Sequence, residues 1–327
     1  EGLPLTQSLR TVLEQTQSKD MQVILNKVIA DVESGSSFAK TLAKYPDTFN
    51  NVFVNLIAAG ESSGTLDEAL TRLADQQEKD AEVISKVRGA LIYPALVLLV
   101  IVGVVIFMLT TVLPQVEQLY VDLKQELPFI TSSMLVVSRF MISFWWAILL
   151  VLGASLFFLG QYSKTTNGKA FFDRLKIRTP LLKNLMMKLY MARFSRTGQT
   201  LLAAGVPMLE MLRITGRAVN NVHIERSLIR ASEKVKGGKA LSQSIEGDEN
   251  FLALVPQMIN IGEQSGSIDD MMGKAAQFYE NELDNQIKTI STTIEPVLMV
   301  VLAVVAGLMV AAILLPVYGL VGDSISL

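Results

Sequence analysis

The 327-residue chain is 50% hydrophobic and 18% charged, and its mean hydropathy of +0.39 is too high for an ordinary soluble domain. Its 29 basic and 31 acidic residues leave a formal charge of -2, so the overall charge does not indicate a nucleic-acid-binding protein. With no cysteine and one histidine, His223, the chain has neither a disulfide framework nor a cysteine nucleophile, and the sequence predicts no metal site and no cofactor.

Residues 1–88 are predicted to form a bundle of short helices. Apolar side chains recur there every three to four residues, as at Leu66, Leu70 and Leu73, which is the spacing of a helix and not of a strand. Thr65, with an acidic residue three positions later, is typical of a helix start, and Gly64 suits the left-handed turn before it. The same signals recur in residues 164–291.

Three stretches predict membrane-spanning helices. Residues 89–116, 140–163 and 296–322 contain no Asp, Glu, Lys or Arg, and each exceeds the roughly 20 residues that a helix needs to cross a bilayer. We place the spans at 89–116, 140–163 and 292–318. The alternative, long buried helices of a soluble protein, requires three such runs in one chain.

Basic residues near the spans predict the orientation. The segment 161–196 contains many Lys and Arg residues against the single acid Asp173, so this side is expected to face the cytoplasm. Residues 117–139 are expected to form an outward-facing loop, and residues 319–327 an outward-facing tail, because both segments are poor in basic residues.

The chain repeats itself at an offset of about 203 residues, in the same order along both copies. After a one-residue deletion the offset is 202, and the match continues into the spans. The motif positions that we interpret as structural are Gly2, Pro4, Gly60, Gly64 and Pro94 in the first copy, and Gly205, Pro207, Gly262, Gly266 and Pro296 in the second. We therefore predict an all-α integral membrane protein with two homologous cytoplasmic helical-bundle domains and three transmembrane helices.

The second copy has a helical segment ahead of its Gly205-Val-Pro207 turn, whereas the first copy begins directly at the equivalent turn. We therefore expect the intact protein to have a further helix upstream of Glu1.

The doubled Gly-Glu-x-Ser-Gly-x-[Leu/Ile]-Asp motif, the two Gly-x-Pro turns, Tyr93-Pro94, Leu127-Pro-x-x-Thr131 and Glu295-Pro296 together resemble a known family. The chain is similar, over nearly its whole length, to the inner-membrane platform proteins of type II secretion and type IV pilus machines. The resemblance implies a non-enzymatic protein of the bacterial inner membrane that couples a cytoplasmic hexameric ATPase to pilin or pseudopilin subunits. It also implies contacts with other inner-membrane assembly proteins. In the family a further region precedes the first domain, which agrees with the helix expected upstream of Glu1.

Four acids of the doubled motif are candidate partner-binding residues: Glu61, Asp67, Glu263 and Asp269. On exposed turns they would meet a basic partner or a second copy of the protein. In a purely structural interpretation, which we favour, the glycines form the turn and the acids stabilise a helix N-terminus.

Further candidates lie in and near the spans. Glu295 stands at the mouth of the third span, before a proline that we expect at the first helical position, and is a candidate partner contact. Ala303, Gly307 and Ala311 form a stripe of small residues that favours close helix packing, with the protein's own spans or with another copy in a homo-oligomer.

Arg193 and Arg196 belong to the basic segment, which marks the cytoplasmic side, contacts anionic membrane lipid or binds an acidic surface of the ATPase. The chain has no Gly-x-x-x-x-Gly-Lys-[Ser/Thr] motif, because Gly238-Lys239 is followed by Ala240. Its energy must therefore come from another protein. A platform of type II secretion is the nearest alternative to a pilus platform, and an oligomeric transporter or a membrane scaffold is a more distant one.

Overall fold

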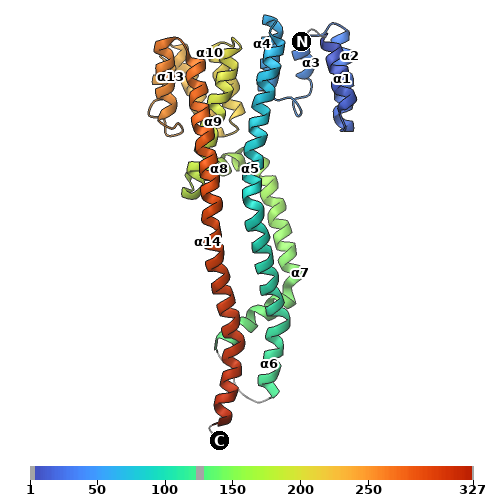
Figure 1. Cartoon of the computed structure of the whole chain (residues 1–327), viewed down its shortest axis with the longest axis vertical. Coiled ribbons are helices and arrows are strands. Elements are labelled where there is room, and N and C mark those ends of the chain that lie inside the picture. The colour runs from blue at the N-terminus through green and yellow to red at the C-terminus, as the bar shows by residue number, and fades with distance from the viewer. Residues whose placement is uncertain (1–3, 123–128, 326–327) are drawn as a thin grey trace. The chain divides into compact units, whose positions relative to one another are not determined.

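The computed structural model describes residues 4–122 and 129–325, and these residues form helices with no β-strand among them (Figure 1). Gly2 and the Leu127-Pro128 pair lie outside the described residues. The prediction of an all-α chain is confirmed for the part that the structure describes.

The chain divides into two compact units. The first unit consists of residues Glu1–Ile84 and Lys169–Asn285, and the second consists of Ser85–Gly168 and Gln286–Leu327. Both copies of the repeat therefore contribute a helical domain to the first unit and hydrophobic helices to the second.

The first unit contains two helical domains that repeat each other helix by helix. Domain 1 comprises α1 (Leu5–Gln15), α2 (Lys19–Glu33), α3 (Phe38–Leu42), α4 (Asn51–Ser63) and the start of α5 (Leu66–Phe107). Domain 2 comprises α10 (Met208–Ala218), α11 (Val222–Lys236), α12 (Leu241–Ile245), α13 (Leu254–Ser265) and the start of α14 (Ile268–Ile325), preceded by α8 (Thr166–Arg178) and α9 (Pro180–Ala203).

Local capping explains where many of these helices begin. Ser18 and Asn50 accept hydrogen bonds from the backbone N–H groups of the first turns of α2 and α4. Asn221 caps α11 in the same way, at the position equivalent to Ser18. Pro4 and Pro207 stand immediately before α1 and α10 with φ of -57° and -58°, so the Gly-x-Pro turn has the same backbone form in both copies.

Helix α9 lies in the core of the first unit and packs against α10 of domain 2 and α4 of domain 1. Its side chains Met191, Phe194 and Leu201 are fully buried. The ring of Phe194 meets that of Phe251 edge-on, with the centroids 5.5 Å apart. The two domains therefore share one continuous apolar core.

The second unit contains the apolar helices. Three candidate membrane spans are long and apolar enough: Leu66–Asp122, Thr131–Lys164 and Ile268–Ala311. Their large apolar side chains are mostly exposed on the protein surface, as helices facing lipid require. The prediction of three spans in a membrane protein is thus confirmed.

The expected position of Pro296 at a helix start is wrong. Both Pro94 and Pro296 lie inside long helices, because α5 and α14 begin at Leu66 and Ile268 and continue without a break into the apolar segments. A proline inside a helix removes one backbone hydrogen bond, which a long helix tolerates.

The segment 117–139 also differs from the loop that the sequence analysis expects. Helix α6 (Leu113–Asp122) enters it, and α7 (Phe129–Lys164) starts within it. The expected tail 319–327 likewise begins inside α14, which extends to Ile325. A scarcity of basic residues indicates the side of the membrane but does not end a helix.

A π-helical turn, η1 (Met108–Val112), joins α5 to α6 just before Pro114. There the Leu113 N–H donates to the Met108 carbonyl, five residues back, which is the pattern of a π-turn. The Ser138 hydroxyl of α7 donates a hydrogen bond to the Leu109 carbonyl within this turn. A side chain from a second helix thus satisfies a backbone group at the irregular position.

Candidate functional site

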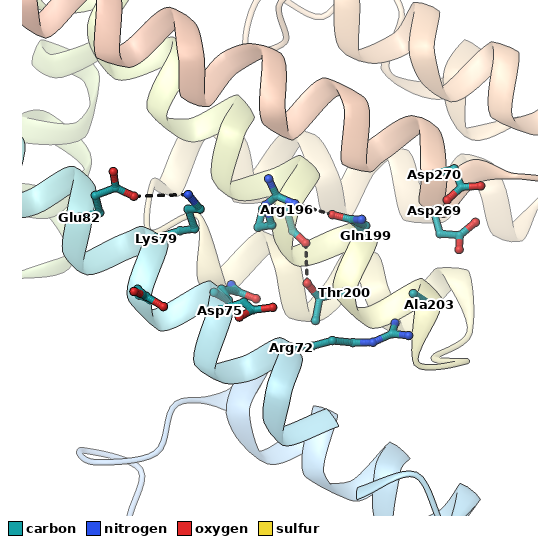
Figure 2. A pocket seen from close by; sticks show the side chains of 12 residues that line it. Arg72, Asp75, Lys79, Glu82, Arg196, Gln199, Thr200, Ala203, Asp269 and Asp270 are labelled. Carbon is teal, nitrogen blue, oxygen red and sulfur yellow. Dashed lines mark hydrogen bonds and ion pairs between the residues drawn. The ribbon is translucent and has the colours of Figure 1, made fainter. Parts of the chain in front are cut away.

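A polar cavity of about 600 Å³ lies in the first unit, between α5, α9 and the first turn of α14 (Figure 2). It is lined by residues from all three helices: Arg72, Asp75, Gln76, Glu78, Lys79, Glu82, Arg196, Gln199, Thr200, Ala203, Asp269 and Asp270. Because the helices come from both copies of the repeat, the cavity exists only where the two domains meet.

Helix α5 contributes a polar stripe to the cavity. Helical spacing places four polar residues on one face of the helix. These are Arg72 and the residues three, four and seven positions after it, Asp75, Gln76 and Lys79. The amide nitrogen of Gln76 donates to the Thr197 hydroxyl of α9 at 3.0 Å. This bond joins the α5 stripe to α9.

Helix α9 supplies a fixed guanidinium. Arg196 Nε and Nη2 donate to the two carboxylate oxygens of Glu280 at 2.8 and 2.7 Å, and Nη1 donates to the Gln199 carbonyl oxygen at 2.8 Å. A bidentate pair of this kind is geometrically specific. Glu280 largely neutralises the positive charge of Arg196. Arg196 therefore forms part of the cavity wall but adds little net charge to it.

Arg193 lies one turn earlier on α9 and outside the cavity lining. Its Nε is 3.8 Å from Asp80 Oδ1 of α5, and this buried nitrogen has no hydrogen-bond partner among the described residues. The long separation gives an ion pair without a hydrogen bond. Arg193 thus provides a second polar link between α9 and domain 1.

The cavity walls carry more acid than base. Asp269 and Asp270 lie in the first turn of α14, where the helix dipole favours negative charge, and Asp75 and Glu78 add two more carboxylates from α5. No hydrogen bond or ion pair of these four side chains is found in the part of the chain that the structure describes. The arrangement suits binding of a cationic group and contains no nucleophile paired with a base.

The two glutamates of the doubled motif lie away from the cavity and have internal partners. Glu61 accepts hydrogen bonds from the backbone N–H groups of Phe38 at 2.8 Å and Ala39 at 3.1 Å, at the start of α3. Glu263 accepts from Leu241 N at 2.6 Å and Ser242 N at 3.3 Å, and also bonds to the Ser242 hydroxyl, at the start of α12. Each carboxylate caps the short helix of its own domain.

The glycines of the motif form the joint between consecutive helices. Gly64 and Gly266 end α4 and α13 in the left-handed conformation, with φ of 75° and 72°. A Cβ at Gly60 would lie 2.7 Å from the Ala69 Cβ, and one at Gly262 would lie 2.7 Å from the Ile268 Cα. Only glycine lets the next helix pass this close.

The structure therefore brings two of the predicted partner-binding residues, Arg196 and Asp269, to one cavity and leaves the others apart. Asp67 is exposed in the first turn of α5. Glu295 is exposed on α14 in the second unit.

The polar stripe of α5 was not predicted from the sequence. Its signal was present, because Arg72, Asp75, Gln76 and Lys79 have helical spacing, but only the apolar spacing and the helix start of this segment were interpreted. Nothing in the local sequence indicates that α9, more than a hundred residues later, packs beside this stripe.

Comparison with known proteins gives concordant matches. The family model described as type II secretion system (T2SS), protein F matches residues 1–114 and 194–316. The chain is 38% identical over 322 residues to the type IV pilus assembly protein PilC of Thermus thermophilus, covering 98% of this chain and 79% of that protein. It is 34% identical to PilC of Myxococcus xanthus, covering 98% and 77% of the two chains. It is also 32% identical to the type II secretion system protein F of Aeromonas hydrophila, covering 97% and 81%.

Proposed function

Because this chain belongs to the family of type II secretion system protein F, we propose that it is the inner-membrane platform protein of a type IV pilus assembly machine. The observation that carries the proposal is the nearly full-length match to pilus assembly proteins at 38% and 34% identity, above the 32% identity to a secretion relative. This match covers both helical domains and the apolar helices, because it includes 98% of the chain.

Both helical domains face the cytoplasm in this proposal, and the three spans cross the inner membrane. The basic residues between the second span and α9 support this orientation, since they resist translocation. The proposed topology is a cytoplasmic domain at 1–88, spans at 89–116, 140–163 and 292–318, and a second cytoplasmic domain at 164–291.

The platform works without enzymatic activity of its own. The chain has no phosphate-binding loop of the Gly-x-x-x-x-Gly-Lys type, so a separate cytoplasmic hexameric ATPase supplies the energy. Helices α5 and α14 each run unbroken from a helical domain into an apolar segment. This continuity supports a role in which events at the cytoplasmic domains affect pilin subunits in the membrane.

The carboxylates of Asp75, Glu78, Asp269 and Asp270 in the cavity are the proposed contacts for a basic partner surface, with the exposed Asp67 as a further contact. Arg193 and Arg196 position α9 beside this surface through their pairs with Asp80 and Glu280. Glu295, exposed near the third span, is the proposed contact for a positive group of a subunit within the membrane.

A platform of type II secretion acting on pseudopilins is the second candidate. It is favoured by the family model, which is described as protein F of that system, and by the 32% identity to a secretion protein.

Deletion of the gene distinguishes the two functions. We expect surface filaments, counted by electron microscopy, to disappear while folded enzymes still reach the medium. Retained filaments with enzymes trapped inside the cell would assign the chain to type II secretion, and no change in either would contradict both functions.

A further inference from the structure

Helix α8 begins immediately after the second span ends. Helix α7 ends at Lys164, and Thr165 accepts a hydrogen bond through its side chain from Gly168 N at 3.1 Å, capping α8. A Cβ at Gly168 would lie only 1.8 Å from the Tyr162 carbonyl oxygen, so the first turn of α8 packs directly on the last turn of α7.

One face of α8 is anchored to the start of α11 in domain 2. The side chain of Asp173 is 2% exposed; it accepts a hydrogen bond from Val222 N at 3.1 Å and pairs with Lys176 at 3.1 Å. The His223 ring nitrogen Nε2 donates to the Ala170 carbonyl at 3.1 Å. These bonds determine which side of α8 faces away from the protein.

The opposite face is both apolar and basic. Phe171 and Leu175 are four residues apart and 56% and 49% exposed, although both are large apolar side chains. Arg174 and Arg178 have the helical spacing that places them on the same face, and both are exposed. No ion pair of either arginine is found in the part of the chain that the structure describes.

We propose that this face of α8 lies in the membrane interface, with Phe171 and Leu175 inserted among the acyl chains and Arg174 and Arg178 bound to anionic phospholipid headgroups. An apolar pair flanked by arginines is the pattern of an interfacial amphipathic helix. The arginine stems pack along apolar surface while their guanidinium groups reach phosphate.

A lipid surface is the occupant because the chain itself brings α8 to the membrane. A helix rises about 1.5 Å per residue and an extended link spans at most about 3.6 Å per residue, so Phe171 lies within roughly 15 Å of the end of α7 whatever the direction of α8. The charge of the face is complementary to an anionic leaflet. The inference needs only the second span and does not depend on whether the protein serves pili or secretion.

The absence of cysteine from the chain allows a direct test in the whole protein. Phe171→Cys and Leu175→Cys would each carry a spin label, in full-length protein reconstituted into vesicles of phosphatidylcholine with or without phosphatidylglycerol. For each spin label, the accessibility to oxygen, which concentrates in the bilayer, is compared with the accessibility to a water-soluble nickel chelate. Ile229→Cys on α11 is the matched control, because Ile229 is an apolar residue of domain 2 that is 55% exposed.

We expect the labels at 171 and 175 to be reached by oxygen and protected from nickel, and the label at 229 to show the reverse. Arg174→Gln combined with Arg178→Gln should lower the ratio of inserted to aqueous label at 171 about fivefold per arginine, in vesicles with phosphatidylglycerol. Lys236→Gln combined with Arg217→Gln removes two exposed charges elsewhere in domain 2 and should leave that ratio unchanged.

Labels at 171 and 175 that stay in water in both kinds of vesicle would overturn the proposal. Protection that arises only after a cytoplasmic protein is added would overturn it too, in favour of a protein partner. Insertion that is equal with and without phosphatidylglycerol would contradict the role of the arginines.

Discussion

At the scale of single residues, one carboxylate in each domain determines how a short helix begins. Helices α3 and α12 contain five residues each, too few to be stable alone. Glu61 and Glu263 satisfy their free N–H groups from the neighbouring helices α4 and α13. Partner binding is therefore not needed to account for an acid at this position of the motif.

Glu61→Ala and Glu263→Ala should each destabilise the protein by about 1–2 kcal/mol, because the buried N–H groups of the short helix lose their acceptor. Thermal unfolding of the full chain in detergent measures the effect. Glu68→Ala is the control: among the described residues Glu68 forms an exposed pair with Arg72 and no other, so its loss should cost less than about 0.5 kcal/mol. Equal effects of all three variants would rule out the capping role.

Asp248, in the turn between α12 and α13, gives a prediction about pH. Burial alone would raise the pKa of Asp248, but hydrogen bonds from Asn250, Ser227 and Arg230 and the charge of Arg230 outweigh it and lower that pKa. The ionised carboxylate therefore stabilises the folded state. This stabilisation is present above the ordinary aspartate pKa of about 3.9 and is lost as the pH falls through the lowered value.

Asp248→Asn should consequently cost about 1 kcal/mol near neutral pH, because the ion pair with Arg230 at 2.9 Å is lost. The difference from the native chain should shrink as the pH falls below about 4. Urea unfolding of the full chain at several pH values tests this, and a difference that grows on acidification would have the wrong sign.

At the scale of elements, the joints between α4 and α5 and between α13 and α14 have the same construction. A left-handed glycine ends the first helix, and a second glycine, four residues earlier, leaves room for the next one. The start of each long helix therefore packs closely against the preceding helix of its own domain.

Gly60→Ala and Gly262→Ala should each cost about 1–3 kcal/mol, since the added methyl group overlaps the following helix. Gly89→Ala is the control, because Gly89 is helical and a Cβ there meets no described atom within 4 Å. That change should be neutral or stabilise by up to about 1 kcal/mol. Unfolding midpoints in detergent distinguish the two joint variants from the Gly89→Ala control. Unchanged midpoints for Gly60→Ala and Gly262→Ala would show that the following helix can move away to make room for the methyl group.

At the scale of the whole molecule, a duplicated unit has produced one shared core and one shared cavity. In the second unit, part of the small-residue stripe of α14 is exposed. A Cβ on Gly307 meets no described heavy atom within 4 Å, and Ala303 is exposed beside it. The small-residue stripe is thus open to a helix of another copy, which is one of the two partners that the sequence left open.

Gly307→Leu should weaken self-association, because its side chain prevents close approach of two helices. The mass of the detergent-solubilised protein, measured by light scattering over a range of concentrations, should shift towards the monomer. Val301→Leu adds bulk to another side of α14 and should leave the mass unchanged. An unaltered mass for Gly307→Leu would exclude the stripe from the contact between copies.

The helical class, the three apolar segments, the duplication and the glycine turns could all be predicted from the sequence, because each depends on spacing or on backbone conformation within a few residues. The partners of Glu61 and Arg196, the surroundings of the polar stripe of α5, and the position of Pro94 and Pro296 inside helices became known from the folded chain. These features depend on contacts over a long range. A cap from another helix, an ion pair across 84 residues and a helix that continues past proline all depend on packing between distant segments, which local periodicity does not encode.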